Sequence, residues 1–80
     1  MTIGEAVQRR ILDLCSQRNL SVNKLCNLCG VTQSTVNNII SGRNRSANIA
    51  TIKKLCDGLD ITLGEFFSTP EFDGLEQEIQ

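Results

Sequence analysis

A row of small polar side chains lies near the middle of this 80-residue chain. The row consists of Gln33, Ser34, Thr35, Asn37, Asn38 and Ser41. Its amides and hydroxyls both donate and accept hydrogen bonds, and one amide can pair with N7 and N6 of adenine together. The apolar residues between them, Val36, Ile39 and Ile40, have helical spacing, so the polar groups share the outer side of a helix. This pattern favours a surface that reads base edges in a DNA major groove.

The alternative interpretation of this row is an ordinary solvated helix face. Such faces favour Glu, Lys and Arg, which combine high helix propensity with solubility. The residues of this row have a lower helix propensity, and none carries a negative charge that would repel phosphate. We therefore expect a DNA-reading face.

Four cysteines form a second group that could do chemistry. They are Cys15, Cys26, Cys29 and Cys56. Cys26 and Cys29 have the spacing of zinc ligands, and the other two would complete a set of four. All four, however, fall on the apolar sides of expected helices, where cysteine acts as a small buried hydrophobic residue. We expect structural roles with no metal and no cofactor, and redox sensing is the weaker alternative. A disulfide framework is disfavoured in a reducing cytoplasm.

The first element that could position these groups is a helix over residues 4–18. Its apolar positions recur at helical spacing, and Arg9 and Arg10 lie off that side, as solvated residues. The positions are Ile3, Val7, Ile11, Leu14 and Cys15. Asn19 follows as a residue that tolerates the left-handed conformation.

Two short helices are expected next, joined by a tight turn. Ser21 caps the first, whose inner side is Leu25, Cys26 and Cys29. Gly30 ends it at positive φ, because glycine adopts that conformation without strain. Thr32 caps the second, which Gly42 stops.

Two further helices complete the expected core. Asn48 caps one that Gly58 ends, and Lys53 and Lys54 lie on its solvated side. Its inner positions are Ile49, Ile52, Leu55 and Cys56. Thr62 and Glu65 form a capping box that opens the last helix, which buries Leu63, Phe66 and Phe67. No segment alternates in the manner of a strand, so the sequence predicts an all-α domain of five helices.

Residues 68–80 are interpreted as an acidic tail attached to a domain formed by residues 1–67. Phe72, Leu75 and Ile79 follow Pro70 at i, i+3 and i+7, which permits a sixth amphipathic helix, although Gly74 weakens it. Three alternatives stay open for the tail: it packs or pairs through these residues, it is disordered, or it binds a partner.

The charge is divided unevenly along the chain. The net charge is −1, but residues 1–59 hold eight basic and three acidic residues and residues 60–80 hold six acidic and no basic ones. The average therefore hides a basic body that suits a DNA partner. The chain has no apolar run long enough to span a membrane and no basic-then-apolar signal at its start. We expect a cytoplasmic protein.

With these motifs in place, the chain resembles the phage-repressor and Cro-like helix-turn-helix family, often called the XRE family. The resemblance covers roughly residues 7–67. It is carried by the spacing of Leu-Ser-x-x-x-Leu-Cys-x-x-Cys-Gly-Val-Thr (20–32), Gln-Ser-Thr-Val-Asn-Asn-Ile (33–39), Ser-Gly-Arg (41–43) and Leu-Cys-Asp-Gly-Leu-x-Ile (55–61). It implies a lambda-repressor-like fold and a sequence-specific transcriptional regulator, often a repressor, that binds a palindrome in double-stranded DNA as a homodimer.

The resemblance also assigns roles by position. Base reading falls to Gln33, Ser34, Asn37 and Asn38. Contacts with the DNA backbone fall to Thr32, Thr35, Ser41, Arg43, Asn44 and Arg45. Ser34 and Thr35 suit either a base or a phosphate. Phosphate contacts set the register and supply most of the affinity.

The chain departs from the family pattern at three places. Cys15 and Ile40 stand where many members carry an Arg and a Glu that form an ion pair, so we expect these two apolar residues to touch. Val22 replaces a Gln that contacts phosphate, which leaves its backbone N–H for that contact. Ala47 replaces a frequent Pro, which should loosen the preceding loop.

Two other functional classes need weighing. A protein-interaction module, such as the antitoxin of a toxin–antitoxin pair, would use the acidic tail to dock a partner. An enzyme is disfavoured, because the chain has no His or Tyr and no nucleophile–base pair or Gly-rich phosphate loop.

Overall fold

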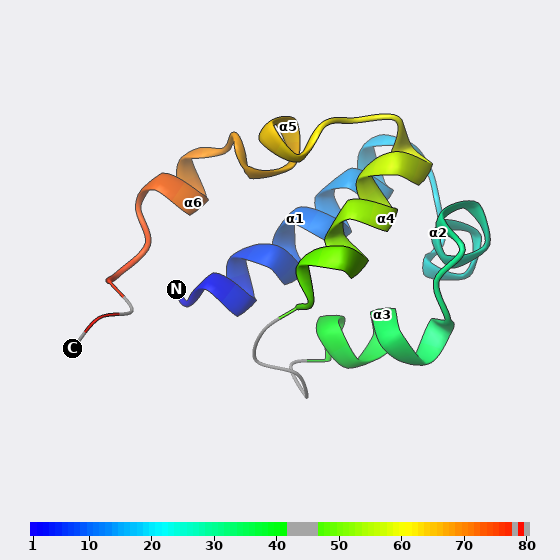
Figure 1. Ribbon diagram of the computed structural model, residues 1–80, viewed down its shortest axis with the longest axis horizontal. Helices are drawn as coiled ribbons and strands as arrows, with labels where there is room; N and C mark the ends of the chain where they lie inside the picture. Colours follow the sequence, from blue (N-terminus) through cyan, green and yellow to red (C-terminus); the bar gives the residue numbers. More distant parts are fainter. Residues whose placement is uncertain (42–46, 78, 80) are drawn as a thin grey trace.

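A computed structural model describes residues 1–41, 47–77 and 79 of the chain, and within them every regular element is a helix (Figure 1). In order they are α1 (Ile3–Gln17), α2 (Val22–Cys29), α3 (Gln33–Ile40), α4 (Ile49–Leu59), α5 (Leu63–Phe67) and α6 (Pro70–Asp73). α2 packs on α4, α3 packs on α1 and α2, α5 packs on α4, and α6 packs on α1. The all-α fold class predicted from the sequence is confirmed.

One apolar core holds α1 to α5 together. Its fully buried side chains include Ile11, Leu25, Val36, Leu55 and Phe66, so every one of these five helices contributes. Burying side chains of this size stabilises the fold by about 1.5–3 kcal/mol each. The helical spacing of apolar residues had predicted most of these positions.

The predicted caps at the starts of α2 to α5 are correct, and α1 begins at Ile3, one residue before the predicted start. The side chains of Ser21, Thr32 and Asn48 accept hydrogen bonds from the first-turn amides of α2, α3 and α4. Thr62 and Glu65 form the expected capping box at the start of α5. Each cap satisfies a backbone N–H that has no partner within its own helix.

The predicted left-handed residues after α1 and α2 are also correct. Asn19 has φ 54° and Gly30 has φ 67°. Each reverses the chain at a helix end, which leads directly into the next cap.

Gly58 does not end α4, contrary to the prediction. α4 continues to Leu59 and stops at Asp60, whose φ is 58°. A Cβ on Gly58 would overlap Sγ of Cys29 and lie 2.8 Å from Cα of Cys29. The glycine therefore permits the close approach of α4 to α2 rather than a turn.

Arg10 is not a solvated residue, as the sequence had suggested. Its Nε donates to the carbonyl oxygen of Phe66 at 2.7 Å, and its Nη2 donates to that of Glu65 at 2.8 Å. Its guanidinium carbon lies 6.0 Å from the centroid of the Phe66 ring. Arg10 thus ties α1 to the carboxyl end of α5, where unpaired carbonyls favour a cation.

Ile49 was predicted on the inner side of α4, and this is wrong. The side chain is 63% exposed, whereas Ile52, Leu55 and Cys56 are buried as expected. Ile49 is the first residue of α4, directly after the Asn48 cap, and at this end of the helix its side chain lies outside the core.

Helix α6 is shorter than the spacing of Phe72, Leu75 and Ile79 predicts. It ends at Asp73 because Gly74 takes the C-cap position. Phe72 packs against Phe67, with ring centroids 5.0 Å apart, while Ile79 is 88% exposed. The first part of the tail is therefore attached to the core, and the end of the tail leaves it.

Three cysteines occupy the core as expected, and Cys29 is half-buried. All four are free thiols, and burial raises the pKa of each. Within the residues that the structure describes, no cluster of three or more Cys, Asp or Glu side chains is arranged to hold a metal ion. Over the same residues, no helix has the length and apolar character needed to cross a membrane.

Candidate nucleic-acid interface

The candidate interface is built on the pair α2 and α3 and the turn between them (Figure 1). Gly30 turns the chain at positive φ, and the N–H of Val31 donates to the carbonyl of Cys26 at 3.1 Å. The Cys26 thiol donates to the carbonyl of Thr32 at 3.8 Å. This hydrogen bond links α2 to Thr32, the N-cap residue of α3, so the thiol also helps to hold the turn between the two helices.

The inner side of α3 fixes its rotation about its own axis. Val36 and Ile39 are buried, and Ile40 is half-buried against the same core. Helical geometry then directs the remaining residues outward. Gln33, Ser34 and Asn37 are exposed, as the row predicts.

Asn38 and Thr35, also on α3, are half-buried. Ser41, the C-cap residue, is exposed, and its hydroxyl donates to the carbonyl of Asn38 at 3.4 Å. The predicted base-reading and hydroxyl residues of α3 therefore share one side of the helix, with Gln33 and Asn37 the most accessible amides.

The amino end of α3 is organised by its two threonines. The Thr32 hydroxyl accepts from the N–H of Thr35 at 3.2 Å and lies 2.8 Å from the Thr35 hydroxyl. Both hydroxyls therefore serve the cap first, and a phosphate contact would use their remaining hydrogen-bonding capacity. The N–H groups of Gln33 and Ser34 are at the helix start, where no carbonyl of the helix can reach them.

Asn23 is a residue of the interface that the sequence interpretation missed. Its Oδ1 accepts a hydrogen bond from Nε2 of Gln33, so the second residue of α2 holds the first residue of α3. This contact orients the Gln33 amide, whose side chain is exposed. The sequence did hold a signal for this role. The family pattern has a polar residue at the position of Val22, and in this chain the amide side chain stands one residue later, at Asn23.

Three predicted phosphate contacts, Arg43, Asn44 and Arg45, lie outside the described residues. The predicted contact between Cys15 on α1 and Ile40 on α3 stays a prediction, and these two helices pack on each other. Cys15 is buried in the core, and Ile40 packs against that core. This environment fits an apolar replacement of an ion pair.

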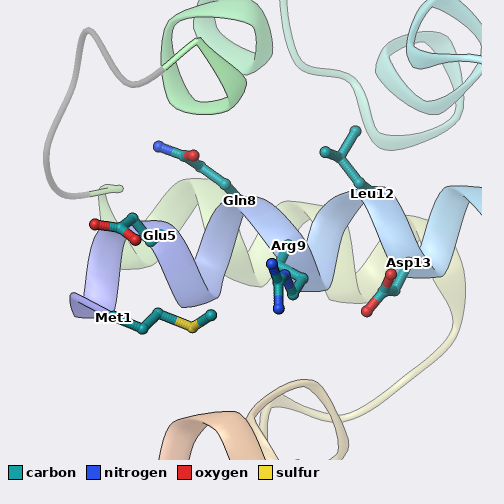
Figure 2. Close-up of a pocket in the computed structure, with 6 residues that line it drawn as sticks. All are labelled: Met1, Glu5, Gln8, Arg9, Leu12 and Asp13. Atoms are coloured by element: carbon teal, nitrogen blue, oxygen red, sulfur yellow. The ribbon is translucent and has the colours of Figure 1, made fainter.

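A depression on the outer side of α1 is the other candidate site. Its volume is about 390 Å³, and Met1, Glu5, Gln8, Arg9, Leu12 and Asp13 line it (Figure 2). Figure 2 shows Gln8 and Leu12 on one side of the helix and Met1 and Asp13 on the other. Since these side chains do not converge on one point and carry mixed charge, the depression favours no ligand.

The interface therefore consists of two helices joined by a tight turn, the second of which exposes amides and hydroxyls on one side and buries apolar residues on the other. This combination defines a helix-turn-helix DNA-binding domain. The chain belongs to the Cro/C1-type HTH DNA-binding domain family, whose model matches residues 10–71. As a member, it is a DNA-binding transcription regulator, and the family is not a class of enzymes.

The structure is also similar to a solved one, described as the crystal structure of the prophage Lp1 protein 11. The two chains are 37% identical, with a TM-score of 0.82. The similarity covers 94% of this chain and 99% of the other. Among curated proteins, none matches the chain.

Proposed function

We propose that this protein is a sequence-specific repressor that reads its operator with α3 in the major groove. The observation that carries the proposal is the hydrogen bond from Gln33 to Asn23, which holds an exposed amide in place at the start of α3. A preoriented amide loses less conformational entropy on binding than a freely rotating one. Such a contact suits reading more than it suits a solvated surface.

The base-reading residues divide by their accessibility. Gln33 would accept from a base through its Oε1, and its second amide hydrogen stays available for an acceptor such as N7 of adenine. Ser34 and Asn37 are exposed beside it, and Asn38 is half-buried. Asn38 would therefore contact a base that lies closer to the body of the domain.

The affinity must come from other groups, since the row holds no positive charge. Thr32, Thr35 and Ser41 would contact phosphates with their hydroxyls, and Arg43, Asn44 and Arg45 would follow α3 along the DNA backbone. The free first-turn N–H groups of α2, including that of Val22, would add to them at the positive end of the helix.

A homodimer would double this interface on a palindromic operator. The centres of its two half-sites would be about 34 Å apart, one turn of the double helix. By occupying a promoter in this way, the protein would block transcription in the cytoplasm and so act as a repressor.

The test begins with selection of bound sites from randomised DNA by the full chain. On the selected site, Gln33→Ala and Asn38→Ala should each weaken binding by about 1–3 kcal/mol and should change binding to random DNA little. Gln17→Ala is the matched control, because Gln17 is an exposed amide at the end of α1, away from the row. Equal losses on both DNAs for the two α3 variants would contradict base reading.

Asn23→Ala isolates the role of the hydrogen bond between α2 and α3. It should weaken binding to the selected site by about 0.5–1.5 kcal/mol and relax the preference at the base that Gln33 reads. A loss of the same size on every sequence would show instead that Asn23 contacts phosphate.

A further inference from the structure

An apolar pocket of about 280 Å³ lies where the first turns of α1 and α4 meet α5. Ile3 and Val7 line it from α1, Ile49 and Ile52 from α4, and Phe67 from α5, with Ala47 at the border. We call this site the apolar pocket. Its lining differs from that of the depression in Figure 2, which carries charged residues.

The rim of the apolar pocket is exposed to an unusual degree. Ile49 is 63% exposed and Ile3 is 37% exposed, although both are large apolar side chains. The folded body of one chain therefore leaves this surface uncovered, at a cost in hydrophobic free energy. A partner that covered the pocket would recover that cost.

The electrostatics of the pocket favour an apolar segment with acidic neighbours. The amino ends of α1 and α4 both lie at it, and helix amino ends carry partial positive charge. The first turn of α4 holds no acidic residue that would offset this charge, and Lys53, which pairs with Asp57, and Lys54 follow it. The first turn of α1 holds Glu5, whose side chain lines the depression in Figure 2 and not the apolar pocket.

The tail of the chain has the complementary composition. Leu75 and Ile79 are four residues apart, with Glu76 and Glu78 between them and Asp73 before them. Phe72 packs on Phe67, which places α6 against the body, but Ile79 is 88% exposed. Figure 1 shows the tail passing the amino end of α1 and continuing on the side away from α4. No described residue of the tail lines the apolar pocket of its own molecule.

We propose that the apolar pocket receives the tail segment 75–79 of a second copy of this chain, and that the two copies exchange their tails reciprocally. The exchange covers Ile79 of the tail and Ile49 of the pocket, which one copy leaves exposed, and a two-fold axis satisfies both contacts at once. This proposal rests on the homodimer of the proposed function and assigns its interface.

The first experiment measures self-association of the full chain without DNA, by sedimentation equilibrium over a range of concentrations. Ile79→Asp changes the tail, and Ile49→Asp changes the pocket. Both residues are exposed, so that neither change disturbs the core. Each should raise the dissociation constant of the dimer by roughly a hundredfold or more, because each loses its apolar contact twice. Leu28→Asp is the matched control, since Leu28 is 54% exposed on α2, outside the pocket.

The second experiment mixes the two variants. Each alone is monomeric in this proposal, but the Ile79→Asp chain keeps an intact pocket and the Ile49→Asp chain keeps an intact tail. The mixture should therefore form a heterodimer with one exchanged tail, which sedimentation detects as a species of twice the mass.

Several outcomes would overturn the exchange. The wild-type chain could stay monomeric at millimolar concentration, or the Ile79→Asp chain could still dimerise through a direct pocket-to-pocket contact. The mixture could also yield monomers only, in which case each tail closes its own pocket or serves another protein. None of these outcomes alters base reading by α3, which the Gln33 and Asn38 variants test separately.

Discussion

The contact between α2 and α4 and the outer side of α3 differ most in how tightly their side chains are packed. At the first, Gly58 and Cys29 pack so closely that a single added carbon has no room. At the second, Gln33, Ser34 and Asn37 face solvent and contact little of the molecule. Changes at the first region should therefore alter stability, and changes at the second should alter DNA binding alone.

Helix α2 connects these two regions. Its Cys29 faces α4, where the thiol donates to the carbonyl of Leu55 at 3.6 Å. At its other end, Asn23 accepts from Gln33 of α3. The tight packing on α4 thus fixes α2, the helix whose Asn23 orients Gln33 of α3. In the proposed function, a region that sets stability supports the base-reading side in this way without touching DNA.

The largest expected effect comes from Gly58→Ala. The new Cβ would overlap Cys29, so α2 and α4 must separate, and we expect a loss of about 3 kcal/mol in the free energy of unfolding. This exceeds the gain of up to about 1 kcal/mol that alanine normally brings to a helix interior. Urea denaturation measures the difference.

A second change at Cys29 sharpens this prediction. Adding Cys29→Ala to Gly58→Ala should restore only part of the stability, because Cα and Cβ of Cys29 would still lie 2.8 Å and 3.0 Å from the new carbon. Full recovery would mean that only the sulfur restricts the approach, and unchanged stability in the single variant would refute the close contact.

Arg10→Gln should have the next largest effect on stability. It removes two hydrogen bonds from a charged donor to the carbonyls of Glu65 and Phe66, which should cost about 2 kcal/mol in the free energy of unfolding. Arg9→Gln is the matched control, because Arg9 is exposed on the same helix. DNA affinity of the folded Arg10 variant should equal that of the wild type, and a selective loss of DNA binding would place Arg10 at the interface instead.

The last expected effect, which is absent at neutral pH, is a dependence of stability on alkaline pH. Burial raises the pKa of Cys15, Cys26 and Cys56 above the ordinary value of 9.0. Below pH 9 the thiols are protonated in both the folded and unfolded chains, so they add no pH dependence. Above pH 9 the unfolded thiols ionise first, and stability falls by at most about 1.4 kcal/mol per pH unit for each buried thiol.

Unfolding free energies measured in urea from pH 7 to 10.5, with a reductant present, test this dependence. Cys56→Ala lowers the overall stability but should also flatten the alkaline slope, since one buried thiol is gone. A slope that the variant leaves unchanged would assign the pH dependence to other groups.

Much of the fold was predictable because its signals are local. The caps at Ser21, Thr32 and Asn48 depend on side chains that bond to amides two or three residues away. The positive φ of Gly30 depends on one residue. The row on α3 was predictable for a related reason, since its inner apolar residues fix which side faces outward.

The errors at Gly58 and Arg10 and the missed role of Asn23 concern contacts between different helices, whereas those at Ile49 and in the length of α6 are local. Gly58 was interpreted as a helix end because glycine often has that role, and only Cys29, on another helix, shows its packing role. Arg10 was placed in solvent because its partners lie 55 and 56 residues away. The pairing of Asn23 with Gln33 likewise depends on the angle between α2 and α3.

The sequence by itself therefore determined the helices, their caps, the family and the polar row, because periodicity and capping act within a turn or two of chain. The tertiary structure alone decided that Arg10 supports the fold and that Asn23 orients Gln33. It also decided that an apolar pocket is present between α1 and α4. These features depend on distances between separate helices, and packing sets those distances only when the whole core closes.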